Sequence, residues 1–173
     1  MNKAKLAITV AIGLLLALGV YAMLGGFNRI DISVEDRSDI NLVGLTYRGT
    51  PQDEGMVETF RRVESLAHKF PEANIHTIYH TEPAGKLDTL QVFVGIEQGD
   101  LADLPEDFEV NTIRCDRVLV AEINSHKWVM PTPAAVKESL EAFAREEGLI
   151  LQDVFVDKII DRNQVKVLAP LEN

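Results

Sequence analysis

Hydrophobic and polar positions follow three kinds of pattern along the chain, and each pattern predicts a different kind of element. Residues 6–24, LAITVAIGLLLALGVYAML, form one continuous apolar run without a charged side chain. From residue 40 onward, stretches of alternating apolar and polar residues predict half-buried strands, and apolar residues three or four apart predict helices. The polar segment between these two parts, residues 28–39, predicts a juxtamembrane linker.

The amino-terminal apolar run is long enough to cross a membrane as a helix. A bilayer core requires about 20 apolar residues in helical conformation, whereas the apolar region of a cleaved signal peptide usually has about 7–15. We therefore predict a single-pass transmembrane signal-anchor over residues 1–27 and membrane contact through residues 6–24, although Val20–Ala22 also fits a signal-peptide cleavage site. Lys3 and Lys5 favour a cytoplasmic amino end and a domain outside the cytoplasm, which is the periplasm in a bacterium. Two arginines that follow the span leave this orientation open.

The first half of the remaining chain predicts the order strand, helix, strand, strand. INLVGLTYRG (40–49) alternates like a strand, and Thr50-Pro51 resembles the start of a helix, with Thr50 as the cap. The helix carries apolar residues at helical spacing and is expected to stop at Pro71. Two further strands are expected at ANIHTIYH (73–80) and LQVFVGIE (90–97), joined by a turn-rich segment.

The second half repeats this order. VNTIRCDRVLVAEINS (110–125) predicts one strand or two, with a bend near Asp116. Thr132 is expected to cap a helix with Pro133 in its first turn, and Gly148 is expected to end that helix. Two closing strands are expected in LQDVFVDKII (151–160) and QVKVLAPL (164–171).

The two repeats together predict an α+β fold. Neither strand–helix–strand–strand unit can bury its apolar surface alone, so we expect them to pair into an antiparallel sheet with two helices on one face, preceded by one transmembrane helix. A ligand pocket is expected in the groove between the halves or on the opposite face of the sheet.

Composition narrows the range of partners. Hydrophobic residues make up 46% of the chain and charged residues 25%, which is typical of a globular protein. Lys and Arg number 17 against 27 Asp and Glu, giving a net charge of −10 without a basic stripe. Such a surface repels phosphate backbones, so we do not expect nucleic-acid binding. The single cysteine, Cys115, excludes an internal disulfide and is expected to be a small buried apolar residue.

Residues that suggest catalytic or metal-binding chemistry are few. His76 and His80 are four apart, but on a strand this spacing separates them by roughly 13 Å, too far to share one metal ion. Alternation places Tyr79 and His80 on opposite faces of that strand, and Ser125 and His126 likewise point apart. HExxH, GxSxG and phosphate-loop patterns are absent, and we expect neither a metal nor a cofactor.

The stretches VGLTYRG, IYHTEP followed by LQVFVGIE, and the final APL resemble the GyrI-like small-molecule-binding domain, which is also the effector-binding half of multidrug-responsive regulators. The resemblance assigns residues 40–173 to such a domain and implies a small-molecule ligand. One membrane span followed by this domain is similar in architecture to the testis-expressed ER-phagy receptor. Since that receptor recruits its partner through a long disordered tail, and regulators bind DNA through a helix-turn-helix segment, we expect neither role here.

The resemblance also implies where a ligand would bind. GyrI-like domains place a Glu on the penultimate strand, inside an aromatic-lined pocket that receives cations. Counted back from QVKVLAPL, this position falls near Lys158, and the neighbouring Asp157 should face the other side of the strand. The candidate ligand-binding residues are three aromatic side chains and one carboxylate: Tyr47, Tyr79, Trp128 and Glu122.

Three functions are consistent with these observations. The first is a membrane-anchored domain that binds small lipophilic molecules for sensing or sequestration. The second is a hydrolase of reactive small molecules, as some GyrI-like proteins are, in which Tyr79 with Glu82 or Glu122 would serve as acid and base. The third is a membrane-tethered scaffold for a protein partner that the sequence does not identify. We expect the first.

Overall fold

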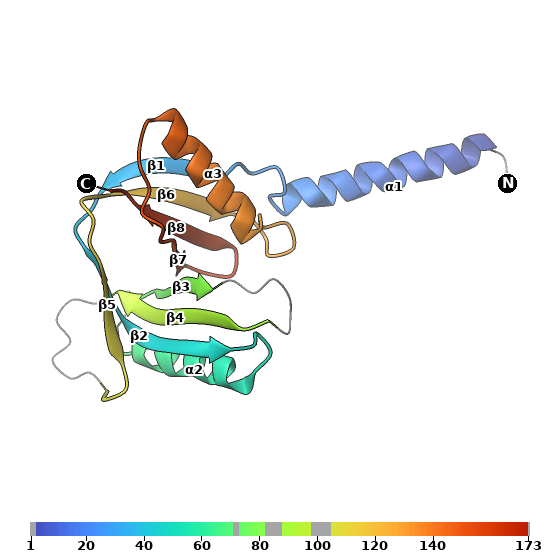
Figure 1. Ribbon diagram of the computed structural model, residues 1–173. Coiled ribbons are helices and arrows are strands. Elements are labelled where there is room, and N and C mark those ends of the chain that lie inside the picture. Colours follow the sequence, from blue (N-terminus) through green and yellow to red (C-terminus); the bar gives the residue numbers. More distant parts are fainter. Residues whose placement is uncertain (1–2, 71–72, 82–87, 98–104, 173) are drawn as a thin grey trace.

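The computed structural model describes residues 3–70, 73–81, 88–97 and 105–172 (Figure 1). Its helices are α1 (Lys3–Met23), α2 (Glu54–Ala67) and α3 (Pro133–Glu146). Its strands are β1 (Asp31–Asp36), β2 (Ile40–Gly49), β3 (Ile75–Thr81), β4 (Leu90–Glu97), β5 (Glu109–Ile113), β6 (Arg117–Asn124), β7 (Val156–Ile159) and β8 (Gln164–Pro170). The predicted turn over residues 81–88 and the predicted stop at Pro71 fall largely outside the described residues.

All eight strands form one antiparallel sheet in the order β1-β6-β8-β7-β3-β4-β2-β5. The central pair, β3 and β7, joins two halves that repeat one order: β2-α2-β3-β4 and β6-α3-β7-β8. Each half is also extended by one strand that comes before the other half in the sequence. β1 precedes β2 but pairs with β6, and β5 precedes β6 but pairs with β2. The predicted α+β fold with two strand–helix–strand–strand repeats is confirmed.

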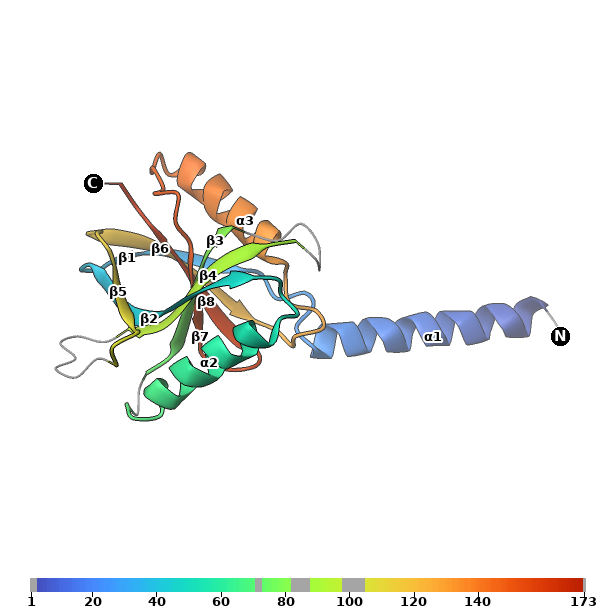
Figure 2. The same cartoon turned by 60° about the horizontal axis from the view of Figure 1, so that its bottom comes forward.

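Both helices lie on the same face of the sheet, over different halves (Figure 2). Thr77 of β3 pairs with Asp157 of β7, which pairs with Val167 of β8, and paired residues of neighbouring strands point to the same side. Val167 packs beneath α3, while Ile75, two residues before Thr77, packs against the α2 side. The centre of this face, between β3 and β7, is therefore flanked by the two helices.

The helix-free face is buried by the curvature of the sheet itself. Gly44 of β2 pairs with Gly95 of β4, and a Cβ on Gly44 would lie 2.0 Å from the carbonyl oxygen of Val94, so only glycine permits this close crossing. The connections β1–β2 and β5–β6 meet where the amide of Arg37 donates to the carbonyl of Asp116. Residues of both halves then form one buried cluster: Ile40, Leu42, Ile78, Phe93, Ile113, Cys115, Val118, Val120, Val156 and Leu168.

The second helix of the domain begins and ends where the sequence predicts. The Thr132 side chain caps α3 by accepting a hydrogen bond from the amide of Ala135 at 3.3 Å, and Pro133 is the first helical residue. Gly148 follows the helix with φ of +66°, a conformation that favours glycine. α3 then packs Val136 against the sheet.

The start of α2 differs from the prediction. Thr50 and Pro51 form a turn that is closed by a hydrogen bond from the amide of Asp53 to the carbonyl of Thr50 at 3.2 Å. The cap is Asp53, whose carboxylate accepts from the amide of Gly55 at 3.0 Å. Asp caps a helix as well as Thr does, and it lies directly before the first helical residue.

The segment expected to be a linker also differs. Within residues 28–39, Asp31–Asp36 form β1, which pairs with β6 from Asp31↔Glu122 to Asp36↔Arg117. Because β1 is an edge strand, most of its side chains are exposed, and Ile32 is the one that packs toward α3. The polar composition of residues 31–36 therefore predicts a linker where the structure has an edge strand of the sheet.

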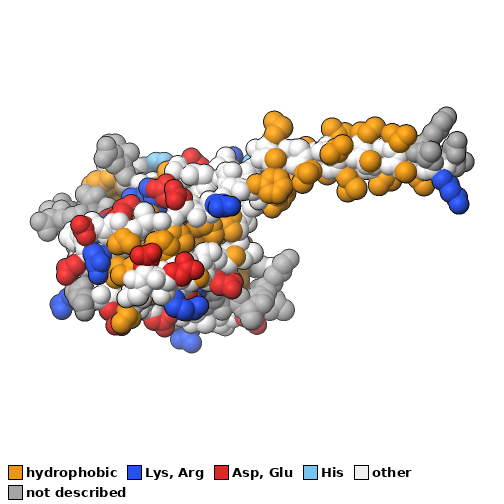
Figure 3. Space-filling view, turned by 90° about the horizontal axis from the view of Figure 1, so that it is seen from above, with side chains coloured by type: hydrophobic (Ala, Val, Ile, Leu, Met, Phe, Trp, Pro, Cys, Tyr) orange, Lys and Arg blue, Asp and Glu red, His pale blue; other side chains and the backbone are white. Residues whose placement is uncertain are grey.

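α1 projects away from the domain (Figure 1). Residues Leu6–Met23 have a mean hydropathy of 2.4, and none of them is buried against the rest of the protein. Hydrophobic side chains surround the helix along its length, whereas charged side chains are scattered over the domain (Figure 3). The helix is long and apolar enough to cross a membrane.

Candidate functional site

A groove of about 680 Å³ lies on the helix side of the sheet, at the seam between the two halves. The end of β3 contributes to one side, the first turn of α3 to the other, and β7 with the residues before it and β8 to the base. This is one of the two places where the sequence predicts a pocket, and neither half forms it alone.

A β-bulge in β3 shapes the groove. Tyr79 pairs with Val92 of β4, but Thr81 pairs with Gln91, so His80 is an additional residue between them. Tyr79 and His80 consequently both line the groove, and both are exposed. The strict alternation that placed these two side chains on opposite faces does not hold at this position.

Charged side chains of both signs line the groove. Asp153 and Asp157 supply carboxylates, and Lys137 of α3 supplies an ammonium group. The Lys137 Nζ lies 4.7 Å from the centre of the Phe155 ring, which is the geometry of a cation–π contact. Among the described residues, the groove thus combines an aromatic ring that accepts a cation with two carboxylates and one ammonium group.

The register of β7, the penultimate strand, determines whether Asp157 or Lys158 faces the groove. Asp157 pairs with Thr77 and Val167 on the helix side, whereas Lys158 pairs with His76 on the helix-free side. As the sequence predicts, these neighbours point in opposite directions. The structure adds that the carboxylate, and not the ammonium group, lies on the groove side.

Two of the four predicted ligand-binding residues are tyrosines, and the structure separates them. Tyr79 lines the groove. Tyr47 is buried beneath α2, where its hydroxyl donates to the carbonyl of Thr50 at 3.0 Å. Burial raises the pKa of Tyr47, and the nearby Asp53 carboxylate raises it further. Tyr47 therefore packs α2 onto the sheet, away from the groove.

The other two predicted residues also lie outside the groove. Trp128 is 78% exposed in the loop between β6 and α3, where its ring meets His126 edge to face with 5.1 Å between centres. Glu122 points to the helix-free face and forms an ion pair with Lys166 of β8. Of the four predicted residues, the structure brings only Tyr79 into the groove.

A polar cluster on the helix-free face is absent from the sequence prediction. His76 is 1% exposed, with Nδ1 3.0 Å from the carbonyl oxygen of Asn74 and Nε2 3.7 Å from the Glu97 carboxylate. Arg37 pairs with the same carboxylate. Burial lowers the pKa of His76 to about 4, against the opposing effect of Glu97. These residues are far apart in sequence, and no motif connects them.

In the part of the chain that the structure describes, neither the arrangement of potential metal ligands nor the environment of Cys115 favours metal binding or thiol chemistry. Among the described residues, no three His, Cys, Asp or Glu side chains are grouped so that they could hold a metal ion. Cys115 is buried in the helix-free core, and burial raises the pKa of its thiol. It behaves as the small apolar residue that the sequence predicts, although it lies between β5 and β6 instead of within a strand.

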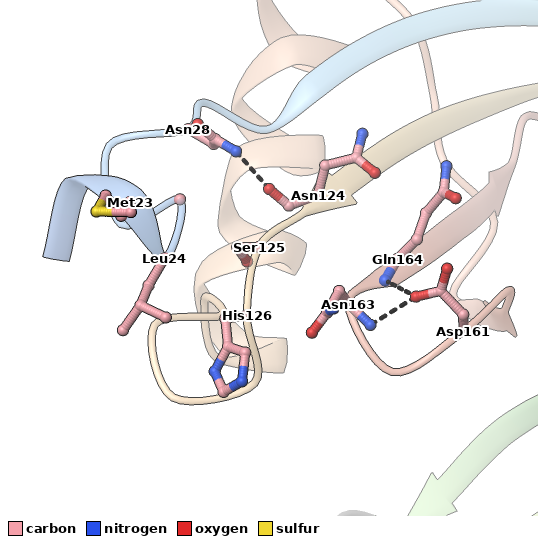
Figure 4. Close-up of a pocket in the computed structure, with 10 residues that line it drawn as sticks. Met23, Leu24, Asn28, Asn124, Ser125, His126, Asp161, Asn163 and Gln164 are labelled. Carbon is pink, nitrogen blue, oxygen red and sulfur yellow. Dashed lines mark hydrogen bonds between the residues drawn. The ribbon is translucent and has the colours of Figure 1, made fainter. Parts of the chain in front are cut away.

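A second hollow, of about 380 Å³, lies where α1 meets the domain (Figure 4). The amide of His126 donates to the carbonyl of Leu24 at 2.9 Å, and the Asn28 side chain donates to the carbonyl of Asn124. Gly25, with φ of +82°, packs directly against the β6–α3 loop. The end of α1 is therefore held by the domain.

No protein-family model and no curated protein sequence matches the chain. Solved structures do match its fold. A hydrolase from Listeria innocua has a TM-score of 0.60 at 9% identity, covering 83% of this chain and 93% of its own. The EcmrR C-terminal domain has a TM-score of 0.58 at 10% identity, covering 83% and 98%.

SAV2435, solved with bound tetraphenylphosphonium, has a TM-score of 0.51 at 13% identity, and the match covers 83% of this chain and 95% of that protein. At identities this low, similarity shows the fold and not the ligand or the activity. The chain therefore shares the fold of these proteins, the GyrI-like fold that its sequence resembles.

Proposed function

We propose that this chain is a membrane-anchored domain that binds small lipophilic molecules, for sensing or sequestration, in the groove between β3, β7 and α3. The groove itself carries the proposal. Its volume of about 680 Å³ suits a ligand of drug size, and its position at the seam lets both halves contact the ligand. Tyr79, Phe155 and Asp157 are the proposed ligand-binding residues.

The groove chemistry favours an organic cation. Asp153 and Asp157 can attract a positive charge, and the Phe155 ring already accepts one from Lys137. A lipophilic cation provides both apolar contact and charge, which matches this lining. The neighbour SAV2435 was solved with tetraphenylphosphonium, a ligand of this class. That comparison supports the choice of probe.

The proposal places α1 across a membrane, with the domain outside the cytoplasm. The folded domain then begins at β1, because this strand is part of the sheet. The loop that holds the end of α1 leads directly into Thr132 and Pro133, which line the groove. A lipophilic ligand concentrated in the bilayer would thus reach a groove close to the membrane.

Titration of the full chain in nanodiscs with tetraphenylphosphonium tests the proposal. We expect the cation to raise the thermal midpoint of the domain, and its neutral analogue triphenylphosphine oxide to do so more weakly. Asp157→Asn should weaken binding of the cation by about tenfold, because it removes a partly desolvated carboxylate that pairs with the bound cation. Binding of the neutral analogue should change little.

Asp36→Asn is the matched control, since Asp36 is an exposed carboxylate on the edge strand β1. It removes the same charge from the protein without touching the groove, so it should leave affinity within about twofold. Equal weakening by both variants would show that only net charge matters. No stabilisation by either compound would contradict the groove as a site for these ligands.

Hydrolysis is a second candidate, because Tyr79, His80 and Asp157 line one groove and supply groups for acid–base chemistry. Glu122 cannot be the base for Tyr79, since the two side chains face opposite sides of the sheet. Glu82, the other predicted base, lies outside the described residues. Turnover of an electrophilic ester that survives Tyr79→Phe, His80→Asn and Asp157→Asn would remove this candidate.

A further inference from the structure

The end of the domain nearest α1 carries an unusual combination of side chains. It consists of three segments, residues 24–30, 125–130 and 160–164, which we call the membrane-proximal surface. Trp128 is 78% exposed on this surface and Phe27 is 63% exposed. Exposed large aromatic rings are costly in water, whereas Trp and Tyr are enriched where proteins cross the membrane–water boundary.

The three segments are held together and held to α1. The amide of Ser125 donates to the carbonyl of Asn163 at 2.9 Å, and the amide of His126 donates to the carbonyl of Leu24 at 2.9 Å. Phe27 packs edge to face against Tyr21 of α1, with 5.0 Å between ring centres. The depth of α1 in a bilayer therefore fixes the position of this whole surface.

Charge on this surface differs from that of the chain as a whole. The three segments contain Arg29, Lys127 and Arg162 but only one carboxylate, Asp161, within a chain of net charge −10. All three basic residues are exposed. Basic side chains are attracted to an anionic bilayer surface, so this end suits lipid headgroups better than the acidic remainder does.

We propose that the membrane-proximal surface rests on the bilayer, with the Trp128 ring inserted at headgroup level and the basic side chains on the lipid phosphates. The inference depends on the proposed anchoring by α1 but not on ligand binding in the groove. The hollow of about 380 Å³ beside Leu24, with its amide, hydroxyl and imidazole groups and the Asp161 carboxylate, then opens among the headgroups (Figure 4). The occupant is the lipid surface and not a second protein.

Trp128 is the only tryptophan of the chain, so its fluorescence reports this contact directly. The full chain is placed in nanodiscs whose lipids carry bromine near the headgroup end or near the far end of the acyl chain. We expect a blue-shifted emission and quenching that is stronger for bromine near the headgroup. Lys127→Gln should reduce the additional quenching that anionic lipid produces.

The control moves the tryptophan to the other end of α3. Ile150 is 64% exposed after α3, away from the α1 contact, so the double variant Trp128→Phe/Ile150→Trp places one exposed tryptophan far from the membrane. Its quenching should be at least about twofold weaker. Equal quenching at the two positions, in protein that is incorporated into the nanodiscs, would overturn the inference while leaving the anchor intact. Failure to be incorporated would overturn both, and binding of tetraphenylphosphonium in the same sample would still report on the groove.

Discussion

The two faces of the sheet both carry ionisable side chains, but the surroundings of these side chains differ. On the helix-free face, His76 is 1% exposed, and its neighbours Glu97 and Arg37 are partly buried. On the helix face, Asp153 and Asp157 border a groove of about 680 Å³. The imidazole of His76 is thus part of the interior on one face, whereas two carboxylates border a groove on the other.

This difference arises from how each face is covered. The helix-free face is curved, so apolar residues of both halves meet and bury it. On the other face α2 and α3 each pack on their own half, and the seam between β3 and β7 remains open. A duplicated unit therefore creates a site where its copies meet, and ionisable residues identify a site only where such an opening exists.

Replacing one phenylalanine on each face is the strongest test of this difference. Phe93 is 1% exposed in the helix-free core, so Phe93→Ala should lower the free energy of unfolding by about 3–5 kcal/mol. Phe155 is only partly buried beside the groove, and Phe155→Ala should cost about 1–2 kcal/mol. Urea unfolding of the anchored protein measures both. Comparable losses would mean that the groove is packed as tightly as the core.

Acid should destabilise the protein through His76. Its pKa is about 4 in the folded chain against 6.5 for an ordinary histidine, so between these values the unfolded chain binds a proton that the folded chain does not. The contribution of neutral His76 to the free energy of unfolding is complete above pH 6.5 and is lost as the pH drops toward 4, by about 3 kcal/mol in all. Urea unfolding at a series of pH values measures this slope.

His76→Asn should remove most of that slope, because asparagine can still donate to the carbonyl of Asn74 but does not titrate. His80→Asn is the control on the groove face, where the imidazole is exposed and its replacement should keep the slope. If both variants retain the full slope, the acid sensitivity belongs to other groups and the buried cluster is not its source.

Local patterns were sufficient for the interior strands and for one helix. Alternation gave the bounds of β2 and β4, and Thr132 with Pro133 marked the start of α3, since these signals depend on adjacent residues. β1 could not be found in this way. Ile32 is its only side chain that is not exposed, and its partner β6 lies more than eighty residues further along the chain.

The position of the groove could be predicted, but most of its residues could not. Central strands such as β4 are apolar on both faces, so their sequence does not tell which face a helix covers. Only the family resemblance groups Glu122 with Tyr79, and the structure shows that these side chains point to opposite sides. The bulge at His80 depends on pairing with β4, and Asp157 could be assigned only once the register of β7 was known.

Lys137 offers a smaller test of the groove. Its ammonium group lies over the face of the Phe155 ring, so a cationic ligand that stacks on this ring must displace the ammonium group. Lys137→Gln should raise the affinity for tetraphenylphosphonium by about two- to fivefold, in line with the strength of an exposed cation–π contact. Isothermal titration measures the change, and Lys69→Gln, which removes an exposed cation after α2, is the matched control. An unchanged affinity would show that the ligand does not use this ring.

The smallest expected effect comes from Glu122 on the helix-free face. Its ion pair with Lys166 is about one-third exposed, so Glu122→Gln should cost less than about 1 kcal/mol of unfolding free energy. Affinity for tetraphenylphosphonium should stay unchanged, because β6 and β8 separate this carboxylate from the groove. If Glu122→Gln weakened binding as much as Asp157→Asn does, the ligand would have to enter from the helix-free face. That result would contradict the assignment of the two faces as well as the site.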